Sequence, residues 1–157
     1  MGSRSKINLA YIAGFLDGDG SLMFQLKKRK DSLLGRRFMV TICFYQDSRH
    51  EKPLFWIKKV IGRGYISRRN DGITELRING YARIESLIKD LLPFIRFKKK
   101  QAVALYKASK ILSNNKKLNS RVLERIIDLM LIIQSENYVT HKKKTKTELR
   151  KILGLTP

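Results

Sequence analysis

Cysteine is nearly absent from this sequence, and its scarcity excludes several classes of protein. With Cys43 alone, the chain can form neither an internal disulfide nor a thiolate zinc cluster. A single free thiol is typical of a reducing, intracellular compartment. Long apolar runs are absent as well, because none approaches the ~20 residues that a membrane-spanning helix needs. We therefore expect a protein without covalent crosslinks and without a membrane partner.

Acidic residues are scarce too. The sequence has 13 Asp and Glu against 34 Lys and Arg, which gives a net charge of +21. Such an excess repels itself in a compact protein and favours a polyanionic partner whose counterions the protein displaces. Nucleic acid is the leading candidate, and the alternatives are a merely soluble basic surface or one that lies on anionic lipid. The hydrophobic fraction of 43% excludes a disordered basic tail.

The first half of the chain switches between helical and strand periodicity. Ser5 or Asn8 is suited to cap a first helix, and this helix is apolar on all sides, which predicts that it is buried. A proline near the start and a glycine after the end frame a second helix, and Asn-Asp-Gly marks a hairpin. The expected elements are a helix to about residue 18, strands at 21–29 and 37–45, a helix at 50–62, and strands at 64–69 and 73–78.

Helices predominate after residue 80. A helical face repeats most strongly within 120–134, and we interpret it as core packing. The lysine-rich segment 141–146 is either a solvated loop or a phosphate contact. The expected helices lie at 81–92, 98–112, 120–134 and 147–153.

The stretch LAYIAGFLDGDGS combines an uncharged helix with two carboxylates. Asp17 and Asp19 follow eight uncharged residues, although the C-terminus of a helix already carries partial negative charge. The intervening glycines let another backbone or a phosphate come close. Oxygen ligands with free coordination positions suit Mg²⁺. A calcium loop is excluded because its pattern would need Gly in place of Leu22 and Glu in place of Lys28, whereas a plain helix-ending turn remains possible.

The segment IAGFLDGDG at 12–20 resembles the signature of the LAGLIDADG homing endonucleases. The resemblance extends over most of the chain, and LLPFIRFKKKQA at 91–102 is similar to a run that the family places after its third core helix. It implies an α+β fold with an α-β-β-α-β-β-α core, an antiparallel DNA-binding sheet and additional C-terminal helices. No second motif copy follows residue 20, which implies the single-motif, homodimeric subclass. We expect one domain over 1–157, with the core at about 5–112 and the C-terminal helices at about 113–157.

Matched position by position, the resemblance implies a divalent-metal site. Asp19 corresponds to the metal-binding carboxylate, and the backbone carbonyl of Gly18 assists it. Gln46 corresponds to a residue that positions water, and Lys98 to a basic residue at the edge of the site. Asp19, Gln46 and Lys98 are thus the expected catalytic residues, and Mg²⁺ or another divalent cation is the expected cofactor.

Three further positions receive no catalytic role from this comparison. A further arginine of the family falls at or near His50, with Arg49 beside it, so its role is open. Asp17 is expected to be structural and to cap or order the helix end.

Two surfaces follow from the homodimer that the resemblance implies. Small residues on the first helix let a second copy approach closely, and the predicted dimer contacts are Ala10, Tyr11, Ala13 and Gly14. Strand alternation sets the sheet face that enters the major groove. The residues expected to contact DNA are Gln25, Lys27, Arg29, Arg37, Cys43, Tyr45, Ser67, Arg69, Glu75 and Arg77 on that face, together with Lys142.

The resemblance implies a site-specific homing endonuclease. Such an enzyme uses a divalent metal to hydrolyse both strands of a long, near-palindromic double-stranded DNA site as a homodimer, leaving short 3′ overhangs. An RNA-binding splicing maturase of the same fold is the alternative, and a ribosomal-type RNA-binding protein, with DGDG as a mere turn, is a third. The expected compartment is a chloroplast, a mitochondrion or an archaeal cytoplasm, which the sequence does not distinguish.

Overall fold

The computed structural model describes residues 5–31, 35–137 and 142–155. Its element order confirms the expected α+β fold, with an α-β-β-α-β-β-α core followed by further helices. The elements are α1 (Lys6–Asp19), β1 (Gly20–Lys28), β2 (Arg36–Asp47), the 3-10 helix η1 (Ser48–His50), α2 (Lys52–Ile61), β3 (Tyr65–Arg68), β4 (Ile73–Asn79), α3 (Tyr81–Leu91), α4 (Lys99–Asn114), α5 (Ser120–Glu136) and α6 (Lys146–Ile152).

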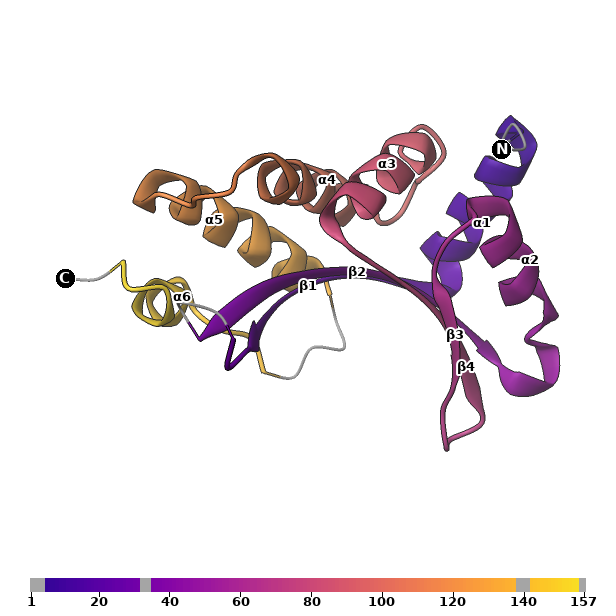
Figure 1. Ribbon diagram of the computed structural model, residues 1–157. Helices are drawn as coiled ribbons and strands as arrows, with labels where there is room; N and C mark the ends of the chain where they lie inside the picture. The colour runs from indigo at the N-terminus through magenta and orange to yellow at the C-terminus, as the bar shows by residue number, and fades with distance from the viewer. Residues whose placement is uncertain (1–4, 32–34, 138–141, 156–157) are drawn as a thin grey trace.

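The four strands form one antiparallel sheet in the order β1-β2-β4-β3. In Figure 1, α1 to α5 lie on one side of this curved sheet, and α6 lies beside the far end of β1 and β2. The opposite face has no helix across it among the described residues. This arrangement leaves one long, concave surface of strands open.

Strand alternation separates the two faces of the sheet. Leu22 of β1 pairs with Ile42 of β2, which in turn pairs with Ile78 of β4, and all three side chains are buried under the helices. Directly paired residues share a face, so the residues between them lie on the open face. The register therefore gives the open face the residues that alternation assigned to it.

The helix α1 is buried on one face only. Ser5 caps it by accepting a hydrogen bond from the Asn8 N–H at 3.2 Å, as one of the two expected caps. Leu9, Ile12, Ala13 and Leu16 lie in the core. The expectation of a helix buried all round is wrong for the single chain, because its other face is exposed to solvent.

Two glycines end elements with left-handed backbone, as their places in the sequence predicted. Gly62 ends α2 with φ of 76°, and Gly72 lies in the β3–β4 hairpin with φ of 81°. Only glycine adopts such angles without strain. Within the described ranges, no helix is long and apolar enough to cross a bilayer.

A carboxylate joins α2 to the β3–β4 hairpin. Glu51 accepts hydrogen bonds from the guanidinium of Arg68, the shortest at 2.6 Å, and from the hydroxyl of the fully buried Thr74 at 2.6 Å. The Thr74 hydroxyl also bonds to the hydroxyl of Ser48 at 2.8 Å. Hydrogen bonds from Arg68 and then from Thr74 lower the pKa of Glu51. This network fixes η1 against the sheet.

The lowered pKa of Glu51 predicts a pH-dependent contribution to stability. The folded state binds fewer protons at Glu51 than the unfolded state, so the contribution is complete above the unfolded pKa of about 4.3. It is lost as the pH falls toward the folded pKa. In urea unfolding between pH 3 and pH 7, wild type should exceed Glu51→Gln in stability at pH 6, and the difference should shrink below pH 4.

The matched control for this experiment is Glu136→Gln, which changes a more exposed carboxylate that pairs with Lys100 at 3.3 Å. That variant should track wild type closely across the range, because exposed ion pairs contribute little. A stability difference for Glu51→Gln that is constant with pH would contradict the assigned role of the carboxylate.

Candidate active site and nucleic-acid interface

The acidic end of α1 opens directly into the first strand. Asp19 is the last residue of the helix and Gly20 the first residue of β1, and both Gly18 and Asp19 are exposed. A Cβ at Gly20 would lie 2.8 Å from the Cα of Leu16, so only glycine permits this close turn. The close backbone approach that the glycines were expected to permit is therefore that of Leu16 in the same chain to Gly20. This close turn places Asp19 where α1 ends and β1 begins.

The other carboxylate, Asp17, faces the turn before α4. It accepts hydrogen bonds from the backbone N–H groups of Arg96 at 2.7 Å, Phe97 at 3.2 Å and Lys98 at 3.0 Å. The Lys98 ammonium returns to α1 and donates to the carbonyl oxygens of Leu16 at 3.0 Å and Asp17 at 2.6 Å. Burial lowers the pKa of Lys98, while the charges of Asp17 and Asp19 act in the opposite direction. The structure therefore brings Lys98 to the same helix end as Asp19.

The end of β2 approaches this helix end from the sheet. Gly20 pairs with Phe44, so Gln46 lies two residues beyond the last β1 partner, and it shares the helix-side face with Phe44. Its side-chain oxygen accepts a hydrogen bond from the Asp47 N–H at 2.9 Å. Strand register thus places Gln46 near the C-terminus of α1, which ends at Asp19 and which the Lys98 ammonium also reaches through its hydrogen bonds.

The residues after Gln46 form a charged turn. Arg49 folds back onto Asp47 with an ion pair at 2.8 Å, which holds the pKa of Asp47 well below its usual range. His50 is exposed at the end of the turn. The arginine carried by this turn is therefore already paired in the isolated chain.

The end of α1 offers few ligands for a metal ion. Among the described residues, no three carboxylate, imidazole or thiol side chains gather closely enough to hold an ion. Asp19 and the Gly18 carbonyl are hard oxygen donors of the kind Mg²⁺ prefers, and Mg²⁺ commonly completes its shell with water and substrate phosphates. The donors thus fit a divalent cation that takes its remaining ligands from other sources.

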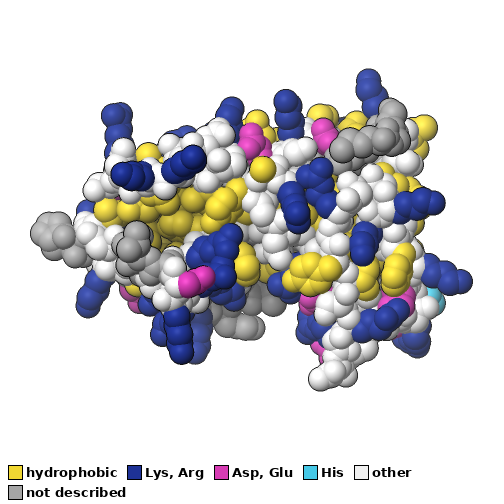
Figure 2. Space-filling model, viewed as in Figure 1, with side chains coloured by type: hydrophobic (Ala, Val, Ile, Leu, Met, Phe, Trp, Pro, Cys, Tyr) yellow, Lys and Arg dark blue, Asp and Glu magenta, His cyan; other side chains and the backbone are white. Residues whose placement is uncertain are grey.

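The open face of the sheet carries the polar residues predicted for it. Gln25, Lys27 and Arg37 lie there partly or fully exposed, and Lys27 pairs directly with Arg37 across β1 and β2. Cross-strand hydrogen bonds order other side chains, as between Ser21 and Tyr45 at 3.0 Å. Figure 2, which views the molecule along the side of the sheet, shows Lys and Arg side chains at many places on the visible surface, with few acidic ones among them. The face combines ordered polar groups with positive charge, which suits a polyanion.

Glu75 sits at the centre of an ion-pair cluster on the open face. Its carboxylate accepts from Arg69 at 3.1 Å and from Arg77 at 2.9 Å, and only 8% of its side chain is exposed. Arg69 also pairs with Asp71 at 2.6 Å. The prediction that Glu75 contacts DNA directly is therefore corrected, because its carboxylate is covered and orients two arginines instead.

Cys43 requires a similar correction. Alternation placed it on the open face, but its side chain is fully buried beneath its neighbours. Burial raises the pKa of its thiol, and Tyr45 hydrogen-bonds to it. The Cys43 side chain is therefore part of the packing beneath the open face and is not accessible to DNA bases in this structure.

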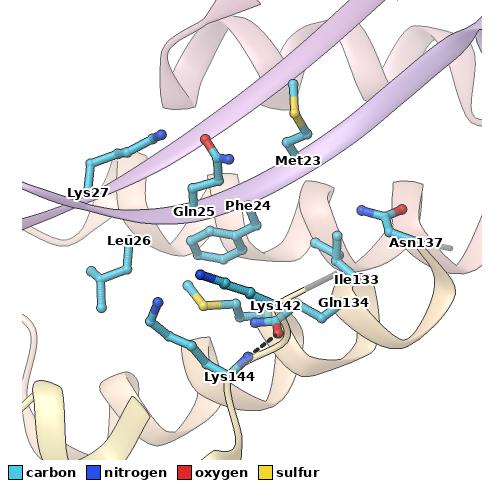
Figure 3. A pocket seen from close by; sticks show the side chains of 11 residues that line it. Met23, Phe24, Gln25, Leu26, Lys27, Ile133, Gln134, Asn137, Lys142 and Lys144 are labelled. Carbon is cyan, nitrogen blue, oxygen red and sulfur yellow. Dashed lines mark hydrogen bonds between the residues drawn. The ribbon is translucent and has the colours of Figure 1, made fainter. Parts of the chain in front are cut away.

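Lys142 lies beside the outer edge of the sheet. It lines a pocket with Lys27, Gln25 and Lys144, bounded by β1 and the end of α5 (Figure 3). The Lys144 N–H donates to the Gln134 side chain at 3.0 Å and ties this segment to α5. Lys142 therefore lies near the open-face residues Gln25 and Lys27, as expected if all three contact the same DNA.

The exposed face of α1 is a stripe of small and apolar residues. Ala10, Gly14 and Gly18 are exposed at a spacing of four, and a Cβ at Gly14 or Gly18 would meet nothing within 4 Å. Ile7 and Tyr11 flank them with 82% and 56% of their surface exposed. Ala13 was predicted to lie in the dimer contact, but it is fully buried in the core of its own chain. The stripe therefore contains Ala10, Tyr11 and Gly14 but not Ala13.

Sequence reasoning missed several residues around this site. The partners of Asp17 lie about 80 positions away, and no local pattern announces them. Phe97 is 87% exposed beside the end of α1, although its hydrophobic character suggests burial. The Glu51 network was also unforeseen. For Phe97, a signal was present in its position between lysines and an arginine in FIRFKKK, where an apolar residue stands out.

The open sheet face is basic, has no helix across it among the described residues, and ends at the acidic C-terminus of α1. These features are typical of a nucleic-acid-binding protein that has a carboxylate suited to bind a metal ion. The model of the LAGLIDADG endonuclease family matches residues 12–112. This chain therefore belongs to the LAGLIDADG endonuclease family. It is 32% identical over 113 residues to the DNA endonuclease I-CvuI of Chlorella vulgaris, covering 72% of this chain and 70% of the relative. Its identity to the DNA endonuclease I-CreI of Chlamydomonas reinhardtii is 28% over 120 residues, covering 76% and 73%.

Solved structures of homing endonucleases have the same fold as this chain. A crystal structure of I-CvuI in complex with the I-CreI target superposes with a TM-score of 0.85 at 27% identity, covering 95% of this chain and 94% of the other. That crystal contained 2 mM Mg, and its DNA is not cleaved. An archaeal intron-encoded homing endonuclease bound to DNA, I-Vdi141I, has a TM-score of 0.82 at 22% identity, covering 94% and 95%, and supports the fold.

Proposed function

We propose that this protein is a site-specific homing endonuclease. As a homodimer with Mg²⁺ or another divalent cation, it would hydrolyse both strands of a long, near-palindromic double-stranded DNA site. The observation that carries this proposal is the meeting of the open basic sheet face with the Asp19 end of α1. DNA lying along the strands then has its backbone directed toward that carboxylate. The family membership and the DNA complexes of relatives support the same conclusion.

The residues of this chain have separable roles in that reaction. Asp19 and the Gly18 carbonyl would hold the cation, which gathers charge on the attacking and leaving oxygens when bound. Lys98 places a positive charge beside them and has a third N–H donor beyond the two given to α1 carbonyls. Gln46, two residues beyond the strand partner of Gly20, would orient water there. The open sheet face fixes the register of the DNA.

The exposed stripe on α1 supports the proposed homodimer. An apolar stripe of small residues lets the backbones of two helices come close, and a two-fold axis makes the same patch serve both chains. A pair of α1 helices would bring two Asp19 carboxylates together at one end. That arrangement supplies the donors that one chain lacks. We add Phe97 to the proposed contact, because it is exposed and its backbone N–H bonds to Asp17 near the end of α1.

The remaining organisation is proposed on the same basis. Buried apolar side chains form one continuous core from Leu9 in α1 to Leu153 after α6, which supports a single domain over residues 1–157. The free, buried Cys43 agrees with a reducing compartment that contains DNA.

The electrostatic part of the proposal is tested by salt. Each phosphate neutralised by the open face should contribute about −0.9 to the log-log slope of affinity against salt concentration. We expect a steep negative slope in titrations of a target duplex, and Lys27→Gln with Arg37→Gln should make it shallower by about 2. The matched control is Lys89→Gln with Lys110→Gln on α3 and α4, which should leave the slope unchanged. A slope that is flat in wild type would contradict DNA binding by this face.

Glu75 should control discrimination between DNA sequences. In Glu75→Gln, Arg69 and Arg77 lose the carboxylate that neutralises and directs them, so they are freer to bind any phosphate. We expect non-specific affinity to rise and the ratio of specific to non-specific affinity to fall about tenfold, the scale of one directed arginine contact. Parallel titrations of target and scrambled duplexes measure this ratio. Glu85→Gln on α3 serves as the matched control, and an unchanged ratio in Glu75→Gln would contradict the orienting role.

A further inference from the structure

Both the backbone and the side chain of Lys98 donate hydrogen bonds to Asp17 of α1. Its backbone N–H donates to Asp17 Oδ1 at 3.0 Å, and its ammonium donates to the Asp17 carbonyl oxygen at 2.6 Å. The other oxygen, Asp17 Oδ2, holds the N–H groups of Arg96 and Phe97. Asp17 thus fixes the turn that carries Lys98 and, together with the Leu16 carbonyl, the position of the ammonium.

The helix dipoles explain why this arrangement is stable. Asp17 lies at the unfavourable end of α1 but close to the favourable N-terminal end of α4, where negative charge is stabilised. Lys98 lies in the turn before α4 and puts its positive charge on two carbonyls in the last turn of α1, those of Leu16 and Asp17, where positive charge is favourable. Each charged residue therefore compensates the terminus of the other helix. Because Asp17 is engaged with the turn before α4, Asp19 is the carboxylate of α1 that is exposed to solvent.

We infer that Asp17 is a positioning residue for the cleavage reaction and acts through Lys98. This inference rests on the proposed endonuclease function and assigns Asp17 more than the capping of a helix end. Without the carboxylate, the turn at 96–98 loses three hydrogen bonds to a charged acceptor, and the lysine loses the anchor of its backbone. Its ammonium then samples positions away from the Gly18–Asp19 end. A shift of about 1 Å in a catalytic group can lower a rate about 100-fold.

The experiment is a double-mutant cycle with Asp17→Asn and Lys98→Met, measured as kcat and KM for cleavage of a target duplex with Mg²⁺. Asparagine keeps one acceptor oxygen but presents an NH₂ group where Oδ2 accepted two N–H donors. We expect kcat to fall about 10- to 100-fold in Asp17→Asn with KM nearly unchanged. The double variant should be no slower than Lys98→Met alone, because a residue that acts only through Lys98 has nothing left to position. Asp128→Asn on α5 is the matched control and should cleave as wild type does.

A second readout needs neither metal nor activity. In metal-free protein, the amide hydrogens of Arg96, Phe97 and Lys98 should exchange at least about tenfold faster in Asp17→Asn than in wild type, with exchange in β2 unchanged. Additive losses in the cycle, or a wild-type kcat in Asp17→Asn, would overturn the inference. If Asp17→Asn does not fold, Asp17→Glu repeats the cycle with the charge kept and the carboxylate moved by one methylene. Failure of the endonuclease function is distinguishable, because wild type itself would then cut no duplex.

Discussion

Replacing Asp19 by asparagine is expected to lower the rate of DNA cleavage by at least about 1,000-fold, with little change in affinity for the target duplex. The reason is that Asp19 is the exposed carboxylate at the end of α1, where the open sheet face ends. Asparagine preserves size and hydrogen bonding but removes the negative charge that a divalent cation needs. The fold should be unaffected, since Asp19 has no place in the hydrophobic core.

Single-turnover cleavage with Mg²⁺ measures the rate, and gel-shift titration with Ca²⁺ measures binding separately. Asp31→Asn is a suitable control because it changes an exposed carboxylate that pairs with Arg29, at 3.1 Å. Cleavage by Asp19→Asn at more than a tenth of the wild-type rate would remove this residue from the metal site.

The second large effect is expected from a charge placed on the exposed face of α1. Gly14→Glu should raise the dissociation constant of the dimer at least about 100-fold, because two like charges would meet across the two-fold axis. The single chain has room for the side chain, with nothing within 4 Å of the added Cβ. Glutamate is also a better helix former than glycine by about 0.5–1 kcal/mol, so the folded monomer should not lose stability.

Sedimentation equilibrium at micromolar concentration gives the mass of each variant, and thermal unfolding confirms that the chain is folded. Ala82→Glu places the same charge on an exposed position of α3 and should leave the dimer intact. Double-strand cleavage should disappear in Gly14→Glu together with the dimer. A variant that remains dimeric and active would show that α1 does not form the subunit contact.

The parts of the fold that sequence predicted well are those set by short-range periodicity. The elements were placed within a few residues of their ends because capping residues, alternation and glycine positions act locally. Alternation also gave the open face of the sheet correctly, as the pairing of Lys27 with Arg37 shows. The role of Asp19 as a metal-binding carboxylate, by contrast, stays a prediction that came from the motif, because spacing alone left a plain turn as an alternative.

The parts that sequence could not give depend on contacts between distant segments. Ala13 was misplaced because small residues on a helix look alike whether they face the core or a partner. Cys43 was misplaced because alternation gives a face but not its depth, and neighbours such as Tyr45 cover it. The role of Asp17 depends on a turn some 80 residues away. Its apparent conflict with the dipole of α1 was the one local sign of such a partner.

The most direct test of the central claim is to incubate the purified protein with a randomised double-stranded DNA library, with and without Mg²⁺, and to sequence the ends. The account predicts defined ends around one near-palindromic site, formed only with the cation and by both strands being cut. The absence of such ends, together with tight retention of structured RNA in a parallel binding assay, would contradict the endonuclease function. That result would instead favour an RNA-binding protein that has kept the fold.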